Sequence, residues 1–178
     1  MNKIVWVMGE SAAGKATFIQ YAVANPDCEL LQQLGYHNHK IIPVKESFYL
    51  EDFDRIAIKD IVLDLLHRQE NAVILIKWQA TDSLHEKYGN VLRKLAFETP
   101  DIPNEIVFLS VTSSVLYERV QKKPWWNDPD IPHSYYSQEQ MDRSIERMRS
   151  HISELLELGF SLTDIDATNG YRLIENTL

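Results

Sequence analysis

The chain has 178 residues, 44% of them hydrophobic, and a formal net charge of −8. This length suits one domain with a sizeable core, and the acidic balance argues against a nucleic-acid platform or an anionic membrane surface. Cys28 is the only cysteine, so no internal disulfide is expected, as is typical of a reducing cytosol. No signal-peptide pattern opens the chain, and no apolar run reaches the roughly 20 residues of a membrane span. We expect one cytoplasmic domain over residues 1–178, either a monomer or a homodimer.

The first predicted element is a short buried strand that leads into a glycine-rich loop. Ile4 to Met8 are all apolar, as in the parallel strands of α/β proteins. Gly9 to Lys15 then reads G-x-x-x-x-G-K, the pattern of a phosphate-binding loop (Walker A motif). Two glycines allow a tight loop whose backbone N–H groups surround an anion, and the positive end of the next helix adds to the attraction. The predicted nucleotide-binding residues are Gly9, Glu10, Ser11, Ala12, Ala13, Gly14, Lys15, Ala16 and Thr17, with Lys15 also catalytic.

The residue after Lys15 departs from this pattern. It is usually Ser or Thr, whose hydroxyl coordinates Mg²⁺, but here it is Ala16, and the hydroxyl follows one place later at Thr17. One residue along a helix turns a side chain by about 100°, so we expect Thr17 not to take over this role. Mg²⁺ readily keeps water ligands. We therefore predict that it is held by the nucleotide and by water, with no protein ligand.

A helix is expected over residues 14–24, because Asn25-Pro26 ends it. Residues 27–39 are expected to be irregular or partly helical. His37 and His39 lie there, two positions apart and without cysteine or acidic residues nearby, which favours a surface loop over a metal site.

The next segments alternate between strand and helix. Residues 40–45 read as a second strand, at an edge of the sheet because Pro43 cannot donate to a neighbour. An apolar face at helical spacing predicts a helix over 52–70. Five consecutive apolar residues within 72–78 indicate a central parallel strand.

A further helix is expected to begin at Thr81 or Asp82, followed by a fourth strand over 105–111 and a helix over 114–123. Residues 124–136 differ in composition, since prolines and large aromatics lie there without periodicity. The later predicted elements are a long helix capped by Ser137 and Gln140 and stopped by Gly159, a fifth strand over 160–166, a turn over 167–170, and a last helix or fraying end from Tyr171.

Strands that alternate with helices, with the phosphate loop after the first strand, predict a doubly wound α/β sheet. With this length and with a helix–loop–helix between the fourth and fifth strands, the chain resembles the P-loop kinase family, which includes nucleoside and nucleotide kinases and the gluconate and shikimate kinases. The resemblance implies a five-stranded parallel sheet of order 2-3-1-4-5, with helices on both faces and a lid insertion, here residues 124–136.

In that family, arginines around the lid contact phosphates, which suits the charge spread over phosphoryl oxygens. The resemblance implies a catalytic and nucleotide-binding role for Arg119, as a phosphate or base contact. Arg143 and Arg147 either contact phosphates or form a solvated face paired with acidic neighbours. Asn169 and Gly170 match the turn that approaches the adenine, or form an ordinary turn.

The family's acceptor site is built after the second strand and at the end of the third. Glu46 lies there and is the candidate base for the acceptor hydroxyl, against the alternative of a plain surface residue. Lys77 stands near the place where relatives carry an acid, and the nearest acid, Asp82, also suits a helix cap. Trp125 and Trp126 either stack on a ligand or pack the lid against the body.

These observations predict an ATP-binding kinase that transfers a phosphoryl group to a small molecule or a nucleotide, with ATP and Mg²⁺ as its cofactors. The alternative is a catalytically weak or inactive nucleotide-binding protein that acts as a sensor or partner-binding module. Ala16 and the missing acid near Lys77 favour this alternative. A GTPase switch is disfavoured, because no N-K-x-D-like guanine motif is present.

Overall fold

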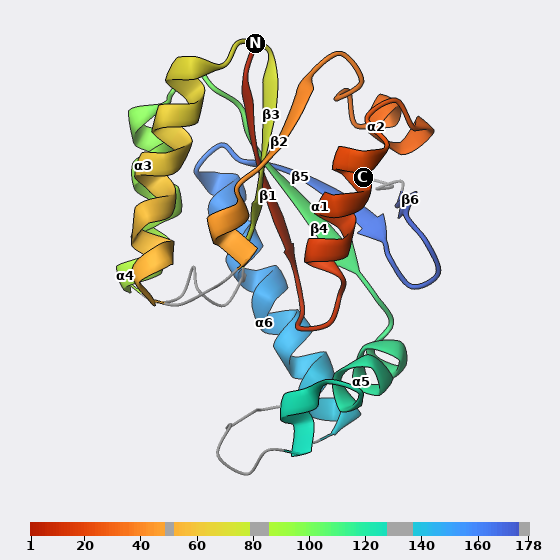
Figure 1. Ribbon diagram of the computed structural model, residues 1–178. Helices are drawn as coiled ribbons and strands as arrows, with labels where there is room; N and C mark the ends of the chain where they lie inside the picture. Colours follow the sequence, from red (N-terminus) through yellow and green to blue (C-terminus); the bar gives the residue numbers. More distant parts are fainter. Residues whose placement is uncertain (49–51, 79–85, 128–136, 175–178) are drawn as a thin grey trace.

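A computed structural model describes residues 1–48, 52–78, 86–127 and 137–174, and Figure 1 shows a central sheet with helices on both sides. The strands are β1 (Lys3–Gly9), β2 (Lys40–Pro43), β3 (Ala72–Lys77), β4 (Asn104–Ser110), β5 (Ser161–Asp166) and β6 (Arg172–Leu173). They lie in the order β2-β3-β1-β4-β5-β6, and all neighbours from β2 to β5 are parallel. The predicted α/β fold with order 2-3-1-4-5 is therefore confirmed, and Pro43 lies on an edge strand as predicted.

The helices follow the predicted alternation with the strands. They are α1 (Lys15–Ala24), α2 (Glu29–Gln33), α3 (Asp52–Arg68), α4 (Glu86–Glu98), α5 (Ser113–Gln121) and α6 (Gln138–Glu157), with short 3₁₀ helices η1 (Lys45–Phe48) and η3 (Pro124–Asn127). The predicted start of the fourth helix at Thr81 or Asp82 lies outside the described residues. The last nine residues of the predicted lid, 128–136, also lie outside them.

Strand β1 shows how the sheet separates two layers of helices. Ile4, Trp6 and Met8 pack in an apolar cluster with α3, α4 and α6, whereas Val5 and Val7 pack in a second cluster with α1, α2 and α5. All five side chains are fully buried, as expected for a strand covered on both faces. Burial of each large apolar side chain stabilises the fold by about 1.5–3 kcal/mol.

The C-terminal tail corrects one prediction. We expected a last helix or a fraying end from Tyr171, but Arg172 and Leu173 form β6, antiparallel to β5. The N–H of Ile174 also donates to the carbonyl of Asp164 at 3.0 Å. A strand of two residues is too short to leave an alternating pattern in the sequence. It forms because the edge of β5 provides backbone groups for pairing.

Helix α6 begins and ends as its sequence predicts. The hydroxyl of Ser137 accepts the N–H of Gln140 at 3.3 Å. At the other end Gly159 has a φ of +91°, its N–H donates to Leu156, and the N–H of Phe160 donates to Leu155. This pair of hydrogen bonds is a Schellman motif, which favours glycine at the left-handed position.

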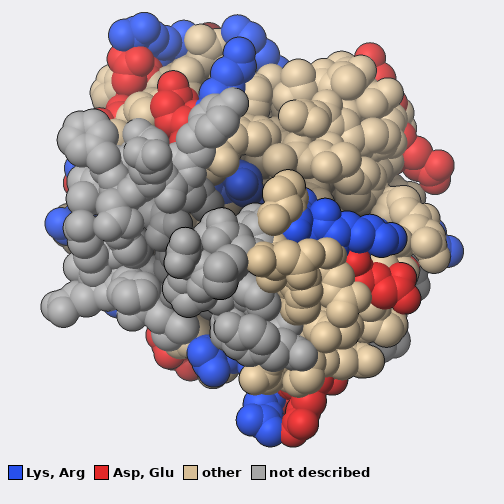
Figure 2. Space-filling view, turned by 60° about the horizontal axis from the view of Figure 1, so that its bottom comes forward, with Lys and Arg blue, Asp and Glu red and all other residues tan. Residues whose placement is uncertain are grey.

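Strands β1 and β4 run downward in Figure 1, and the segments that follow their carboxyl ends, between β1 and α1 and between β4 and α5, lie in the lower half of the view. Figure 2 turns this end forward and shows basic side chains beside and within a hollow in the middle of the face. Ligands of open α/β sheets usually bind at this end.

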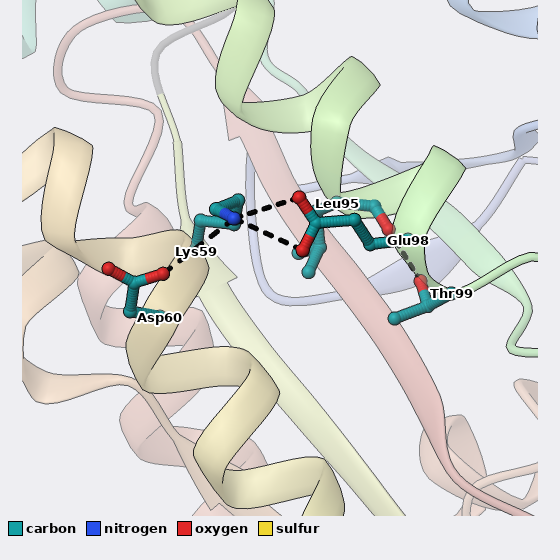
Figure 3. A network of polar contacts seen from close by, with 5 residues as sticks. All are labelled: Lys59, Asp60, Leu95, Glu98 and Thr99. Atoms are coloured by element: carbon teal, nitrogen blue, oxygen red, sulfur yellow. Dashed lines mark hydrogen bonds and ion pairs between the residues drawn. The ribbon is translucent and has the colours of Figure 1, made fainter.

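At the side of the molecule, Lys59 on α3 donates to both carboxylate oxygens of Glu98 on α4, at 2.8 and 3.1 Å (Figure 3). The hydrogen bond with Glu98 raises the pKa of Lys59. Asp60 lies 3.7 Å from the same ammonium. Because these groups are partly exposed to water, the network contributes little to stability. None of the described helices is long and apolar enough to cross a membrane.

Candidate functional site

The loop between β1 and α1 has the backbone that the glycine spacing predicts. Gly9 has a φ of +148°, and a Cβ there would lie only 3.0 Å from the carbonyl oxygen of Leu109 on β4. Gly14 is the N-cap of α1, has a φ of +92°, and accepts the N–H of Phe18 at 2.8 Å. Conformation and close packing both require glycine at Gly9, whereas conformation alone favours it at Gly14.

Lys15 is the first residue of α1, and its side chain folds back over the loop. Its ammonium donates to the carbonyl oxygens of Gly9 at 2.8 Å and Glu10 at 2.9 Å, and the residue is only 4% exposed. Glu10 is also buried, and its Oε1 accepts the N–H of Ser11 at 2.9 Å. Lys15 therefore holds the start of the loop together in this structure.

One cleft of about 470 Å³ joins three segments that are far apart in the sequence. The phosphate loop and the first turn of α1 form one wall, the end of α5 forms a second, and the segment after β5 forms a third. The lining residues are Ala12, Ala13, Gly14, Thr17, Arg119, Lys122, Lys123, Ala167, Gly170 and Tyr171. Every charged residue in this lining is a cation, which suits an anionic ligand.

Arg119 connects the second wall of the cleft to the third. Its Nη2 donates to the carbonyl oxygens of Thr168 at 2.8 Å and Ala167 at 3.2 Å. These two hydrogen bonds fix the guanidinium on the wall of the cleft. Arg119 and the turn at 167–170, which the resemblance singled out separately, therefore lie side by side. Gly170 lines the cleft, whereas Asn169 is exposed and is not part of the described lining.

The third wall is also held by Asp166 and Tyr171. The Oδ1 of Asp166 accepts the N–H of Thr168 at 3.0 Å, and this hydrogen bond is the main reason why the pKa of Asp166 is lowered. The ring of Tyr171 lies 5.2 Å from those of Phe18 and Tyr21 on α1, and burial raises its pKa. The third wall therefore packs against α1, the helix that follows the phosphate loop.

The phosphoryl acceptor is expected to bind beside η1 and the end of β3. Glu46 lies in η1 and is exposed, so its predicted role as a base stays a prediction. Its neighbour Ser47 is fully buried, donates to the carbonyl of Val44 at 2.6 Å, and accepts the N–H of Lys77 at 3.0 Å. The Nζ of Lys77 donates to the carbonyl of Phe48 at 3.2 Å. Ser47 and Lys77 thus join η1 to the end of β3.

Two further candidates, Trp126 and Arg143, contact other side chains of the protein. The ring of Trp126 lies edge-on to Tyr117 at 5.8 Å between centroids, as expected if it packs η3 against α5; the side chain of Trp125 is not described. Arg143 pairs with Glu139 on the solvated face of α6, which agrees with the alternative of a surface ion pair.

The described residues give no sign of a metal ion held by the protein. No three His, Cys, Asp or Glu side chains gather in the part of the chain that the structure describes. Ala16 supplies no hydroxyl, and Thr17 faces the cleft described above. The binding of magnesium through nucleotide and water alone therefore stays a prediction.

Sequence reasoning did not find every residue of the site. Tyr171 and Ala167 line the cleft, but the prediction treated them as part of a tail and a turn. Arg149 on α6 also escaped notice. Its partners lie on β4 and β5, and no local pattern in the sequence indicates such a contact.

No family model matches the chain, and no curated protein matches it. Among solved structures, the chain is similar to the unliganded crystal structure of a sugar kinase from Janibacter sp. HTCC2649. The match has 18% sequence identity and a TM-score of 0.47, and it covers 94% of this chain and 86% of that chain. A likeness at this level concerns the fold and identifies neither a substrate nor an activity.

Proposed function

We propose that the chain is an ATP-binding kinase that transfers the terminal phosphoryl group to a small molecule or a nucleotide. The observation that carries this proposal is the cleft that joins the phosphate loop to Arg119, Lys122 and Lys123 and to the segment after β5. A loop shaped for phosphate, next to three cations and a wall with an aromatic ring, suits a nucleoside triphosphate.

In this proposal, the triphosphate lies along the loop from Gly9 to Thr17, at the N-terminus of α1. The base side of the nucleotide lies against the wall that Arg119 and the turn at 167–170 form together. Lys15 leaves the carbonyl oxygens of the loop and turns its ammonium toward the outer phosphates. That exchange replaces two neutral acceptors with a charged one, which forms stronger hydrogen bonds.

The proposed reaction is an in-line displacement. The hydroxyl oxygen of the acceptor forms a bond to the terminal phosphorus, the bond to the bridging oxygen breaks, and ADP leaves. The hydroxyl proton goes to a base, for which Glu46 stays the candidate. Charge neutralisation by Lys15 and positioning of the nucleotide by Arg119 supply most of the rate in this kind of reaction.

A second candidate function is nucleotide binding with little or no catalysis, as in a sensor or partner-binding module. Ala16 favours it, because the usual hydroxyl ligand of Mg²⁺ is absent. Both candidates predict binding of a nucleoside triphosphate, and they differ in turnover.

The test is calorimetric titration of Lys15→Ala with ATP. We expect binding to weaken by roughly 2–3 kcal/mol, the scale of a hydrogen bond to a charged group. Because Lys15 is buried and bonds to two carbonyl oxygens, the melting temperature of the variant must also be measured. Lys94→Ala, which removes an exposed lysine of α4, is the matched control. Unchanged affinity in a folded Lys15→Ala protein would contradict the assignment of the phosphate loop.

A further inference from the structure

Arg149 on α6 joins the carboxyl-terminal parts of two neighbouring strands. Its Nη1 donates to Asp164 on β5 at 2.9 Å, and its Nη2 donates to the hydroxyl of Ser110, the last residue of β4, at 2.7 Å. The guanidinium carbon lies 4.1 Å from the centroid of the Phe108 ring. Only 9% of the Asp164 side chain is exposed, so the carboxylate depends on Arg149 for its ion pair. The backbone pairing of β4 with β5 sets the spacing of the two strands, and this one planar side chain links their side chains near the carboxyl ends.

Both strands lead directly into walls of the cleft. Ser110 precedes the N-cap of α5, Thr112, and α5 carries Arg119. Asp164 lies three residues before Ala167, which begins the third wall. The N–H of Ala167 donates to the carbonyl of Ser110 at 2.8 Å.

Loss of this link would let the end of β5 shift relative to β4 and would therefore move Ala167 and Thr168, the acceptors of Arg119, relative to Arg119. It would leave the phosphate loop in place, because β4 stays paired with β1 as far as Leu109, against which Gly9 packs, so that only β5 moves. The contacts of Arg149 thus act on one part of the cleft and not on the other.

We propose that Arg149 is a positioning residue for the base side of the nucleotide cleft. It acts through Ser110 and Asp164 and touches no ligand itself. This inference rests on the proposed function, because it assumes that a nucleotide occupies the cleft. A purely structural role for Arg149 would lower stability and weaken all ligands of the cleft together.

The experiment compares two ligands of the wild-type chain and of Arg149→Met by calorimetric titration. The first ligand is ATP, which needs both the phosphate loop and the base side; the second is inorganic tripolyphosphate, which needs only the loop. We expect Arg149→Met to bind ATP at least tenfold more weakly and to bind tripolyphosphate within twofold of the wild type. Arg68→Met removes an exposed arginine that pairs with Asp64 on α3, and we expect it to change neither affinity.

A folded Arg149→Met protein with unchanged ATP affinity would overturn the inference, as would an equal loss for both ligands. If Arg149→Met does not fold, Ser110→Ala decides, because it removes one hydrogen bond and keeps the ion pair with Asp164. A loss of about threefold for ATP alone then supports the inference, and no selective loss overturns it. A wild-type chain that binds neither ligand would instead overturn the proposed function, and this inference with it.

Discussion

The base side and the acceptor side of the phosphate loop differ in how firmly described contacts hold their candidate residues. On the base side, Arg119 is held by the carbonyl oxygens of Ala167 and Thr168, and Arg149 links the strands beneath. On the acceptor side, the contacts of Ser47 and Lys77 join η1 to β3, but Glu46 is exposed to solvent. The difference teaches that the described contacts fix the side of the cleft proposed to hold the base, whereas Glu46, the candidate base for the acceptor, is exposed to solvent.

The largest expected effect tests the base side through Arg119→Met. The variant loses a cation from the cleft and two hydrogen bonds to the third wall. The loss of one charged hydrogen bond is worth about 1.5–3 kcal/mol, so we expect the dissociation constant for ATP to rise roughly tenfold to a hundredfold. Titration with ATP and with tripolyphosphate measures it. Tripolyphosphate that weakens as much as ATP would show that Arg119 contacts phosphate and not base.

The sequence predicts those parts of the fold that have a local pattern. Five apolar residues from Ile4 predict β1, the glycine spacing predicts the loop, and Pro43 predicts an edge strand. The strand β6 could not be predicted, because Arg172 and Leu173 form it only by pairing with β5. Helix α5 spans Ser113–Gln121, where the prediction was 114–123, and its N-cap is Thr112, without a side-chain hydrogen bond.

The site divides in the same way. The loop from Gly9 to Lys15 could be singled out because its residues are consecutive, and Arg119 because of the family resemblance; their roles in binding stay predictions. The pairing of Arg149 with Asp164 joins a helix to a strand 15 residues later. An arginine at that position in an amphipathic helix reads as a surface residue, so only packing in three dimensions reveals the contact.

A smaller effect is expected from Ala16→Ser, which tests whether the loop lacks a metal ligand. Serine fits where alanine does at the start of a helix and restores the hydroxyl that Mg²⁺ usually binds. If the missing ligand limits catalysis, the rate of ATP turnover with a panel of acceptors should rise about fivefold. This corresponds to a transition state stabilised by roughly 1 kcal/mol. Ala13→Ser, at a buried position of the same loop, is the comparison for a hydroxyl added elsewhere.

The alternative of a catalytically weak binding protein depends on this result. A wild-type chain that already turns over at roughly 1–100 per second, the range of kinases, and a serine variant that is no faster would show that Ala16 is no defect. The alternative would then lose its main support. No turnover in either form, together with normal ATP binding, would favour the binding module.

The smallest effect concerns Asp166, which holds the turn of the base-side wall. Its pKa is lowered from 3.8, first by the hydrogen bond from the N–H of Thr168 and also by the charge of Arg172. A carboxyl whose pKa is lower in the folded chain stabilises the fold above its unfolded pKa, and this contribution is lost as the pH falls through the folded value. Asp166→Asn keeps an oxygen that can accept the same N–H but cannot titrate. Because 35% of the Asp166 side chain is exposed, we expect the variant to melt only roughly 1–2 °C below the wild type at pH 7, and this difference should vanish as the pH falls through the lowered pKa of Asp166. Thermal melts from neutral to acidic pH measure it, and a gap that stays constant with pH would show that the charge of Asp166 does not hold the turn.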